Sequence, residues 1–169
     1  MASTLKVDTI QTSGGTTALT TDSSGRVFRS NIPQWFASFS AQSGVDYAGS
    51  WNKLQFVKDT EYGIPASSDF DDANNRYVAP VAGLYWHSWS IRADGFSGGY
   101  IHAESRKNNT SMSKYRSITG GAGTNYESIG CQGIVYLGVG DYIEAFVNFS
   151  GDSSVNLDND SNFHGYLIG

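Results

Sequence analysis

The sequence predicts an all-β domain, a two-layer sandwich or barrel, behind a short N-terminal arm. Of its 169 residues, 14% are aromatic, 20 are glycine and only three are proline. Aromatic side chains fit the half-buried faces of strands, and frequent glycine is typical of turns. From residue 32 onward, short apolar runs alternate with turn signals, which is the pattern of an antiparallel β-sandwich.

Residues 1–31 differ in composition from the rest and predict an arm. Their early apolar anchors are Leu5, Val7 and Ile10, and residues 12–25 are rich in Gly, Ser and Thr. Such a stretch cannot bury enough apolar area to fold as a domain alone. We therefore expect the arm to anchor the chain to something else.

Short strands are expected in this arm and at the start of the head, which covers residues 32–169. Apolar and polar residues alternate at residues 5–8, and the turn cluster at residues 22–25 leads into a second apolar pair. We expect the arm strands to become ordered against a partner. The first head strands are predicted at residues 34–39 and 53–56.

Residues 77–91 carry the most informative strand pattern. A Pro/Gly turn separates a short strand from a long one, in which Tyr85, His87, Trp89 and Ile91 occupy alternate positions. Successive side chains of a strand point to opposite faces, so these four share one face. We expect His87 to point into packed aromatic side chains.

The second half of the head predicts three further features. Residues 133–147 are typical of a hairpin with a Gly-rich turn at residues 138–141, and the apolar run at residues 163–169 predicts a terminal strand inserted in a sheet. Residues 106–127 are polar and contain several glycines, which predicts a long loop or a weak hairpin with an exposed tip.

Charge and composition exclude several classes of protein. Lys and Arg number 11 and Asp and Glu 16, a net charge of −5 without a basic cluster, so nucleic acid is not an expected partner. No signal peptide and no run of 18 apolar residues is present, so we expect no membrane insertion. The single cysteine, Cys131, allows no intrachain disulfide and no two-cysteine metal clip.

No catalytic constellation is visible, and we expect neither an enzyme nor a cofactor. The sequence lacks a nucleophile elbow, a phosphate loop and a carboxylate pair placed in contrasting environments. The three histidines have no metal-ligand spacing, so no metal site is predicted. Carboxylates at residues 69–72 and 158–160 could offer oxygen ligands to calcium. The second group lacks the glycine of an EF-hand loop, and solvated turns are the favoured interpretation.

The long strand and the chain's ending resemble a known family. Tyr77, followed after five residues by Gly-Leu-Tyr-Trp-His-Ser-Trp at residues 83–89, resembles the signature of the globular heads of complement component one-q and the tumour-necrosis-factor-like superfamily. The Gly-Asp turn at residues 140–141 and the ending Ser-Asn-Phe-His-Gly-Tyr-Leu at residues 161–167 are similar to later parts of the pattern. His87 departs from it, since the family has Phe there.

This resemblance implies a two-sheet antiparallel jelly roll of ten strands that assembles as a homotrimer around aromatic side chains near a threefold axis. The aromatic residues that it assigns to the core or the trimer seam are Tyr77, Tyr85, Trp89 and Phe163.

The arm resembles the N-terminal segments of tail-fibre and other virion proteins of marine bacteriophages. The similar stretches are residues 3–11, 14–20 and 24–27. Together with a complement-like head and no signal peptide, the resemblance favours a virion protein assembled in the cytoplasm of the host bacterium. Assembly there requires neither secretion nor disulfides.

Surface aromatic and polar residues outside the core pattern are candidates for binding, since aromatic faces stack on sugar rings. They are Tyr47, Trp51, Asn108 and Tyr126.

The hypothesis is a non-enzymatic phage structural protein, a homotrimer whose arm docks to other virion proteins. Its Leu5, Val7 and Ile10 would add short strands to a partner or to each other. Its head would serve as a tail-fibre or receptor-binding appendage for host attachment, with a cell-surface glycan or receptor as ligand, or as a capsid decoration protein. The alternative is a secreted complement-like or glycan-binding ligand module outside a virus.

Overall fold

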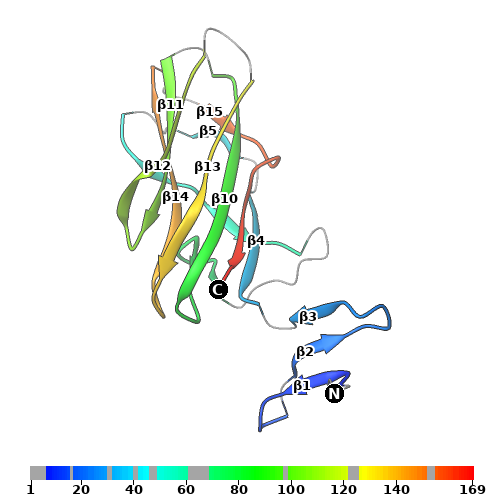
Figure 1. The fold of residues 1–169 in the computed structure, drawn as a ribbon. Coiled ribbons are helices and arrows are strands. Elements are labelled where there is room, and N and C mark those ends of the chain that lie inside the picture. Colours follow the sequence, from blue (N-terminus) through cyan, green and yellow to red (C-terminus); the bar gives the residue numbers. More distant parts are fainter. Residues whose placement is uncertain are drawn as a thin grey trace. The chain divides into compact units, whose positions relative to one another are not determined.

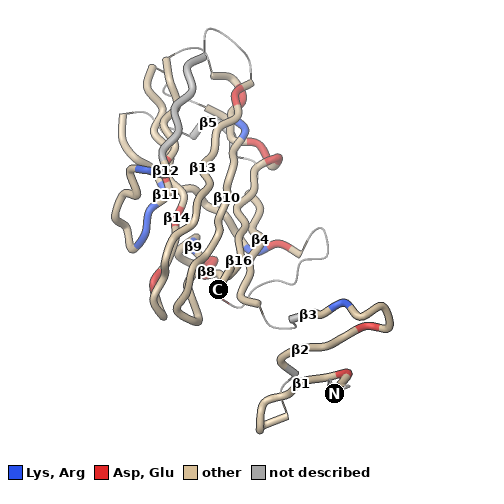
Figure 2. Tube along the Cα trace, viewed as in Figure 1, with Lys and Arg blue, Asp and Glu red and all other residues tan. Residues whose placement is uncertain are grey.

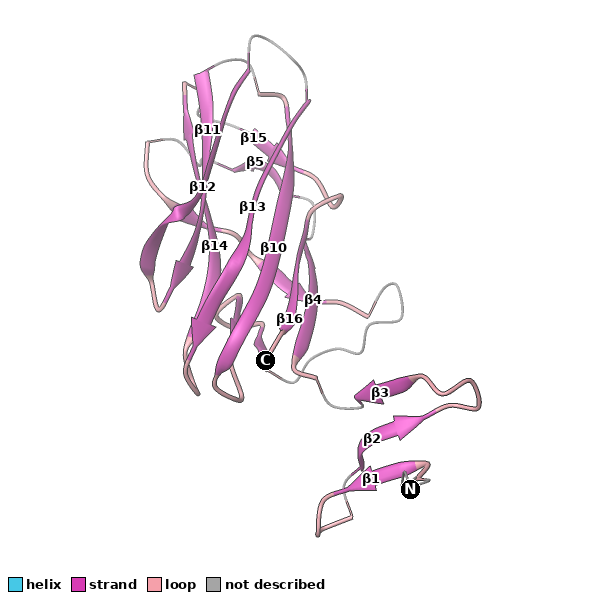
Figure 3. Cartoon of the chain, viewed as in Figure 1, coloured by secondary structure: helices cyan, strands magenta, loops and turns pink. Residues whose placement is uncertain are grey.

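The computed structural model describes residues 7–15, 17–29, 32–39, 42–45, 49–60, 69–96, 99–121, 126–151 and 155–169. The chain divides into two compact units, Met1–Ile32 and Pro33–Gly169. All helix and strand assignments within the described residues are strands, so the all-β prediction is confirmed (Figure 3).

The N-terminal unit is a small antiparallel sheet in the order β1-β2-β3, formed by β1 (Thr9–Gln11), β2 (Thr17–Thr21) and β3 (Val27–Arg29). The predicted turn before β3 is present. Asp22 closes it, because its Oδ1 accepts hydrogen bonds from the backbone N–H groups of Ser24 and Arg26, each at 2.9 Å. A carboxylate that caps its own turn in this way stabilises the reversal without a core.

The strand predicted at residues 5–8 is wrong in its position. Leu5 lies outside the described residues, and Val7 and Asp8 precede β1. Pairing with β2 decides the register, with Ile10 opposite Leu19 and the Thr21 N–H donating to the Asp8 carbonyl at 3.0 Å. The three strands pair with one another, which is one of the two arrangements expected for the arm, and docking to a partner stays a prediction.

The head consists of two antiparallel sheets (Figure 1). The β10 sheet has the order β5-β15-β10-β16-β4-β7, with β13 also paired to β10, and the β14 sheet has the order β12-β11-β14-β9-β8, with β6 also paired to β14. Their bounds are β4 (Gln34–Phe39), β5 (Gln42–Val45), β6 (Asn52–Lys53), β7 (Phe56–Lys58), β8 (Phe70–Asp71), β9 (Arg76–Val78), β10 (Gly83–Asp94), β11 (Gly99–Lys107), β12 (Thr110–Gly121), β13 (Tyr126–Leu137), β14 (Tyr142–Ser150), β15 (Val155–Leu157) and β16 (Asn162–Leu167).

Two local predictions fail because the chain changes sheets. The expected hairpin at residues 133–147 has its turn, but β13 pairs with β10 while β14 pairs with β11, so the turn connects the two sheets. The single strand expected at residues 53–56 is divided into β6 and β7, which also belong to different sheets. Leu54 lies between them with 0% exposure, and its N–H donates to the Ala145 carbonyl at 2.9 Å.

Of the two alternatives expected for residues 106–127, a long loop or a weak hairpin, the long loop is wrong, because most of the described residues lie in strands. A two-residue turn, Asn108 and Asn109, with φ of 50° and 60°, joins β11 to β12 in a hairpin. Asn tolerates this left-handed conformation better than most residues. Polar composition did not prevent strand formation, because the backbone groups of β12 pair with β11 while several side chains, such as Ser111 and Ser113, are exposed.

The core lies between the two sheets and is rich in aromatic residues. As predicted from the alternation of β10, Tyr85, His87, Trp89 and Ile91 share one buried face, each at most 1% exposed. Trp35 of β4 stacks on Tyr77 with ring centroids 3.9 Å apart and meets Phe163 edge-on. The predicted terminal strand is present as β16, between β10 and β4.

Gly165 allows this aromatic packing next to the central strand. A Cβ at this position would lie 2.3 Å from the Trp35 ring and 2.4 Å from the Trp86 carbonyl oxygen. Neither neighbour can move easily, since one is a buried ring and the other is backbone. The glycine in the ending at residues 161–167 is therefore explained by sterics, because no side chain fits at this position.

Gly165→Ala is expected to lower the free energy of unfolding of the head by about 2–3 kcal/mol through overpacking. Denaturant unfolding followed by tryptophan fluorescence measures the effect. Gly138→Ala is the control, because a Cβ there meets nothing closer than 3.4 Å. Equal stability of the two variants would contradict the steric explanation.

His87 is a buried imidazole inside the aromatic core. Its Nε2 lies 3.0 Å from the Ser105 hydroxyl, which also accepts a hydrogen bond from the Trp89 indole at 2.9 Å, and its ring meets Tyr115 edge-on. Burial lowers the pKa of His87 from 6.5 to about 4, since the charged form would lose its hydration.

Below pH 6.5 the unfolded chain takes up a proton at this residue before the folded chain does, so stability decreases from pH 6.5 toward pH 4. The loss contributed by His87 is expected to reach about 3 kcal/mol at pH 4. His87→Phe, which places the family's residue here, should flatten the dependence of Tm on pH in this window. An unchanged slope would show that His87 does not cause it.

Candidate functional site

The outward side of the β10 sheet carries large apolar residues next to the buried face. Leu84 and Trp86 alternate with the core positions of β10, and the strand register places Tyr136 opposite Leu84. Trp86 lies opposite Ile134 on one side and Tyr166 on the other. These five residues are named here the outer apolar face. Four of them are exposed: the exposed fraction is 46% at Leu84 and Tyr166, 50% at Ile134 and 59% at Tyr136. Trp86 is half-buried.

This face has no charged member, and its rings form contacts across the strands. Trp86 lies 5.5 Å from Tyr166 and 5.3 Å from His164, measured between ring centroids. In Figure 2, charged residues occur on β10 only toward its C-terminal end, at Arg92 and Asp94. A contiguous, uncharged and exposed aromatic surface is typical of a surface that another protein covers.

All four aromatic residues that the resemblance assigned to the core or the trimer seam lie in the core. Tyr77, Tyr85 and Phe163 are 0% exposed and Trp89 is 1% exposed. A seam between subunits would have to use the neighbouring positions on the same strands. These positions could have been read from the sequence, because residues next to the core positions of a strand point to its opposite face.

Asn108, a predicted binding residue, is engaged in holding two turns together. Its Nδ2 donates to Asp141 Oδ1 at 2.7 Å, and its Oδ1 accepts from the Tyr142 N–H at 2.9 Å. Lys107 lies 2.7 Å from the same carboxylate. The bonds from Lys107 and Asn108 hold the pKa of Asp141 well below its usual range. The structure therefore gives Asn108 an architectural contact, while Tyr47 lies outside the described residues.

Tyr126 lies at the other end of the β10 sheet beside a cluster of charges. Its ring is 60% exposed and lies 4.7 Å below the Arg92 guanidinium. Arg92 also contacts Asp94 at 3.0 Å and Asp160 at 2.7 Å, and Asp158 lies 3.7 Å away. The carboxylates of residues 158–160, considered as calcium ligands, thus face a cation of the chain itself. Among the described residues, no group of three or more His, Cys, Asp or Glu side chains is placed to hold a metal ion.

Charged residues on the outward side of the β14 sheet form a buried network that the sequence analysis missed. Glu104, 0% exposed, pairs with Arg106 at 2.5 Å, and Glu144, 3% exposed, pairs with Lys53 at 3.0 Å. The sequence did carry one sign of this network, because Glu104 and Arg106 occupy alternate positions of one strand, where opposite charges can pair on the same face. Their burial depends on residues far away in the sequence.

Trp51, another predicted binding residue, belongs to this network. The Arg106 guanidinium lies 3.9 Å from the Phe146 ring centroid and 5.7 Å from that of Trp51. Trp51 is half-buried and lies 6.0 Å from His102. It is therefore a partly exposed ring above paired charges, which is compatible with stacking on a ligand.

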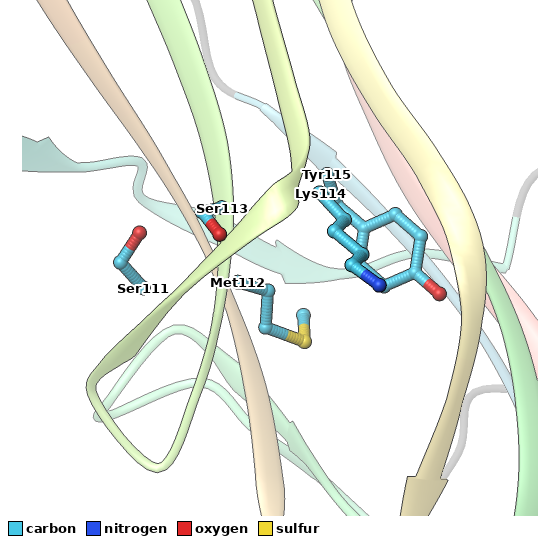
Figure 4. A pocket seen from close by; sticks show the side chains of 5 residues that line it. All are labelled: Ser111, Met112, Ser113, Lys114 and Tyr115. Atoms are coloured by element: carbon cyan, nitrogen blue, oxygen red, sulfur yellow. The ribbon is translucent and has the colours of Figure 1, made fainter.

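A shallow hollow of about 300 Å³ lies beside β12 (Figure 4). Its lining, Ser111, Met112, Ser113, Lys114 and Tyr115, comes from consecutive positions of one strand. The Tyr115 hydroxyl donates to the Ile134 carbonyl of β13. Among the described residues, the lining therefore brings together no polar groups from two different elements.

In the part of the chain that the structure describes, no helix is long and apolar enough to span a membrane.

Comparisons with known proteins support the fold. No protein-family model matches the chain, and no curated protein matches it. Among solved structures, the globular domain of zebrafish complement 1qA protein superposes with a TM-score of 0.58 at 14% sequence identity, covering 82% of this chain and 98% of that one. The two-sheet sandwich is thus a jelly roll of the complement one-q and tumour-necrosis-factor-like type, as the signature around β10 predicted.

Proposed function

We propose that this protein is a non-enzymatic homotrimeric structural and binding protein, and that the outer apolar face is its subunit interface. The observation that carries the proposal is this uncharged patch, Leu84, Trp86, Ile134, Tyr136 and Tyr166, exposed on the β10 sheet. Leaving such a surface in water is unfavourable by roughly 25 cal/mol per Å². Burial against further copies removes that cost.

Three copies are favoured over two by the family resemblance, which implies a threefold arrangement of heads. A closed ring of identical contacts buries the same face on every subunit and leaves no open edge for further growth. The threefold axis also repeats any binding surface of the head three times, which raises avidity for a repeated ligand.

The place of action that we propose is a bacteriophage virion, with the N-terminal unit docked to other virion proteins and the head available as a tail appendage or capsid decoration. The support is the resemblance of the arm to phage virion proteins and the shape of that unit. Val7 and Ile10 are 45% and 49% exposed, so the small sheet has apolar side chains that a partner could cover. The alternative, a ligand module acting outside a virus, needs no such docking partner.

The purified protein is expected to have a solution mass of about 55 kDa, three times the 18.3 kDa chain, by native mass spectrometry. Ile134→Lys places a charge in the middle of the outer apolar face and should yield monomers. Tyr100→Lys, at a similarly exposed position on the β14 sheet, is the control and should leave the trimer intact. A monomeric unmodified protein would refute the proposed assembly.

Deletion of residues 1–31 is expected to abolish incorporation into virions while the head remains folded and trimeric. The reason is that the anchoring side chains Leu5, Val7 and Ile10 are removed, whereas the core of the head is untouched. Western blotting of purified particles measures incorporation. Particles that retain the truncated protein would show that the arm is not the anchor.

A further inference from the structure

Three aromatic rings on the outward side of the β14 sheet have no role in the interface proposed above. Tyr100 and His102 alternate on β11, and their rings stack with centroids 4.7 Å apart at an interplanar angle of 20°. Trp51, just before β6, lies 6.0 Å from His102 at 40°. Tyr100 is 43% exposed and the other two rings are half-buried. We name Trp51, Tyr100 and His102 the aromatic platform.

Polar groups at the platform have hydrogen-bonding capacity to spare. Asn148 of β14 lies directly opposite His102 in the strand register and is half-buried. Within the described part of the chain, the side chains of Asn148, His102 and Tyr100 form no hydrogen bond. An amide and a phenol can each donate and accept, and an imidazole ring can donate a hydrogen bond. The platform can therefore bind a ligand that presents both donors and acceptors.

The charges beside the platform are balanced and already paired. Arg106 contacts Glu104, and Lys53 contacts Glu144, with both carboxylates buried. Two cations and two anions leave no net charge, and each cation would have to share its carboxylate partner before it could bind an anion. This arrangement disfavours an anionic polymer as the ligand and favours a neutral one.

We propose that the aromatic platform binds a neutral glycan. A pyranose ring presents an apolar C–H face that can stack on the face of Tyr100 turned away from His102, while its hydroxyl groups exchange hydrogen bonds with Asn148 and His102. The Arg106 guanidinium, paired with Glu104, lies 5.7 Å from the Trp51 ring centroid, a contact that restrains this ring and lowers the cost of ordering it on binding. This inference rests on the proposed function, since threefold repetition makes a weak single site effective and it names the ligand class of the head.

The test uses the purified full-length protein and four soluble polymers: a neutral glucan, mannan and galactan, and an anionic polyuronate. Tryptophan fluorescence and calorimetry measure binding. At least one neutral polymer should bind saturably, with little change on adding salt. His102→Ala and Asn148→Ala should each weaken that binding about tenfold, the loss of one stacking or hydrogen-bonding partner of about 1.4 kcal/mol.

Tyr126→Ala is the comparison variant, because Tyr126 is the other exposed aromatic residue that the sequence predicted to bind, and it lies on the other sheet beside Arg92 instead of at the platform. It should leave binding unchanged. Binding to the polyuronate alone, binding to no neutral polymer, or an equal loss in Tyr126→Ala would each overturn the proposal. The solution mass of every variant is measured in parallel, so that failure of the trimer is distinguished from failure of the glycan site.

Discussion

The alternation of side chains along β10 is the constraint on which the rest of the head depends. This strand is paired on one edge with β13 along its full length and on the other with β16 and β15. Its backbone is therefore held in one register, and every second side chain must enter the core. The positions between them, Leu84 and Trp86, are directed outward by the same geometry.

Close approach of the neighbouring elements makes this arrangement possible. Gly165 brings β16 against Trp35 and the β10 backbone, and Gly133 leaves room for the Tyr115 ring between β12 and β13. A Cβ at Gly133 would lie 2.2 Å from that ring. His87 then lies in a compact aromatic environment in which only its neutral form is favourable, which connects core packing to acid sensitivity.

The two outward faces of the sandwich differ in chemistry, and the proposed functions follow that difference. The outer apolar face of the β10 sheet is uncharged and suits burial against identical subunits. The β14 sheet carries paired charges beneath partly exposed rings and spare hydrogen-bonding groups, which suits a hydrated ligand such as a sugar. Assembly and recognition can therefore occupy separate surfaces of the same small domain.

The sequence by itself determined the all-β class, the buried face of β10 and the turns at Asp22 and at residues 138–141. These features depend on local patterns, because alternation within a strand and the conformational preferences of a turn involve only near neighbours. Only the tertiary structure decided that β13 and β14 join different sheets, that the polar stretch after Asn109 is a strand, and that Glu104 and Glu144 are buried. Each of these depends on pairing or packing with residues far away in the chain, which no local pattern specifies.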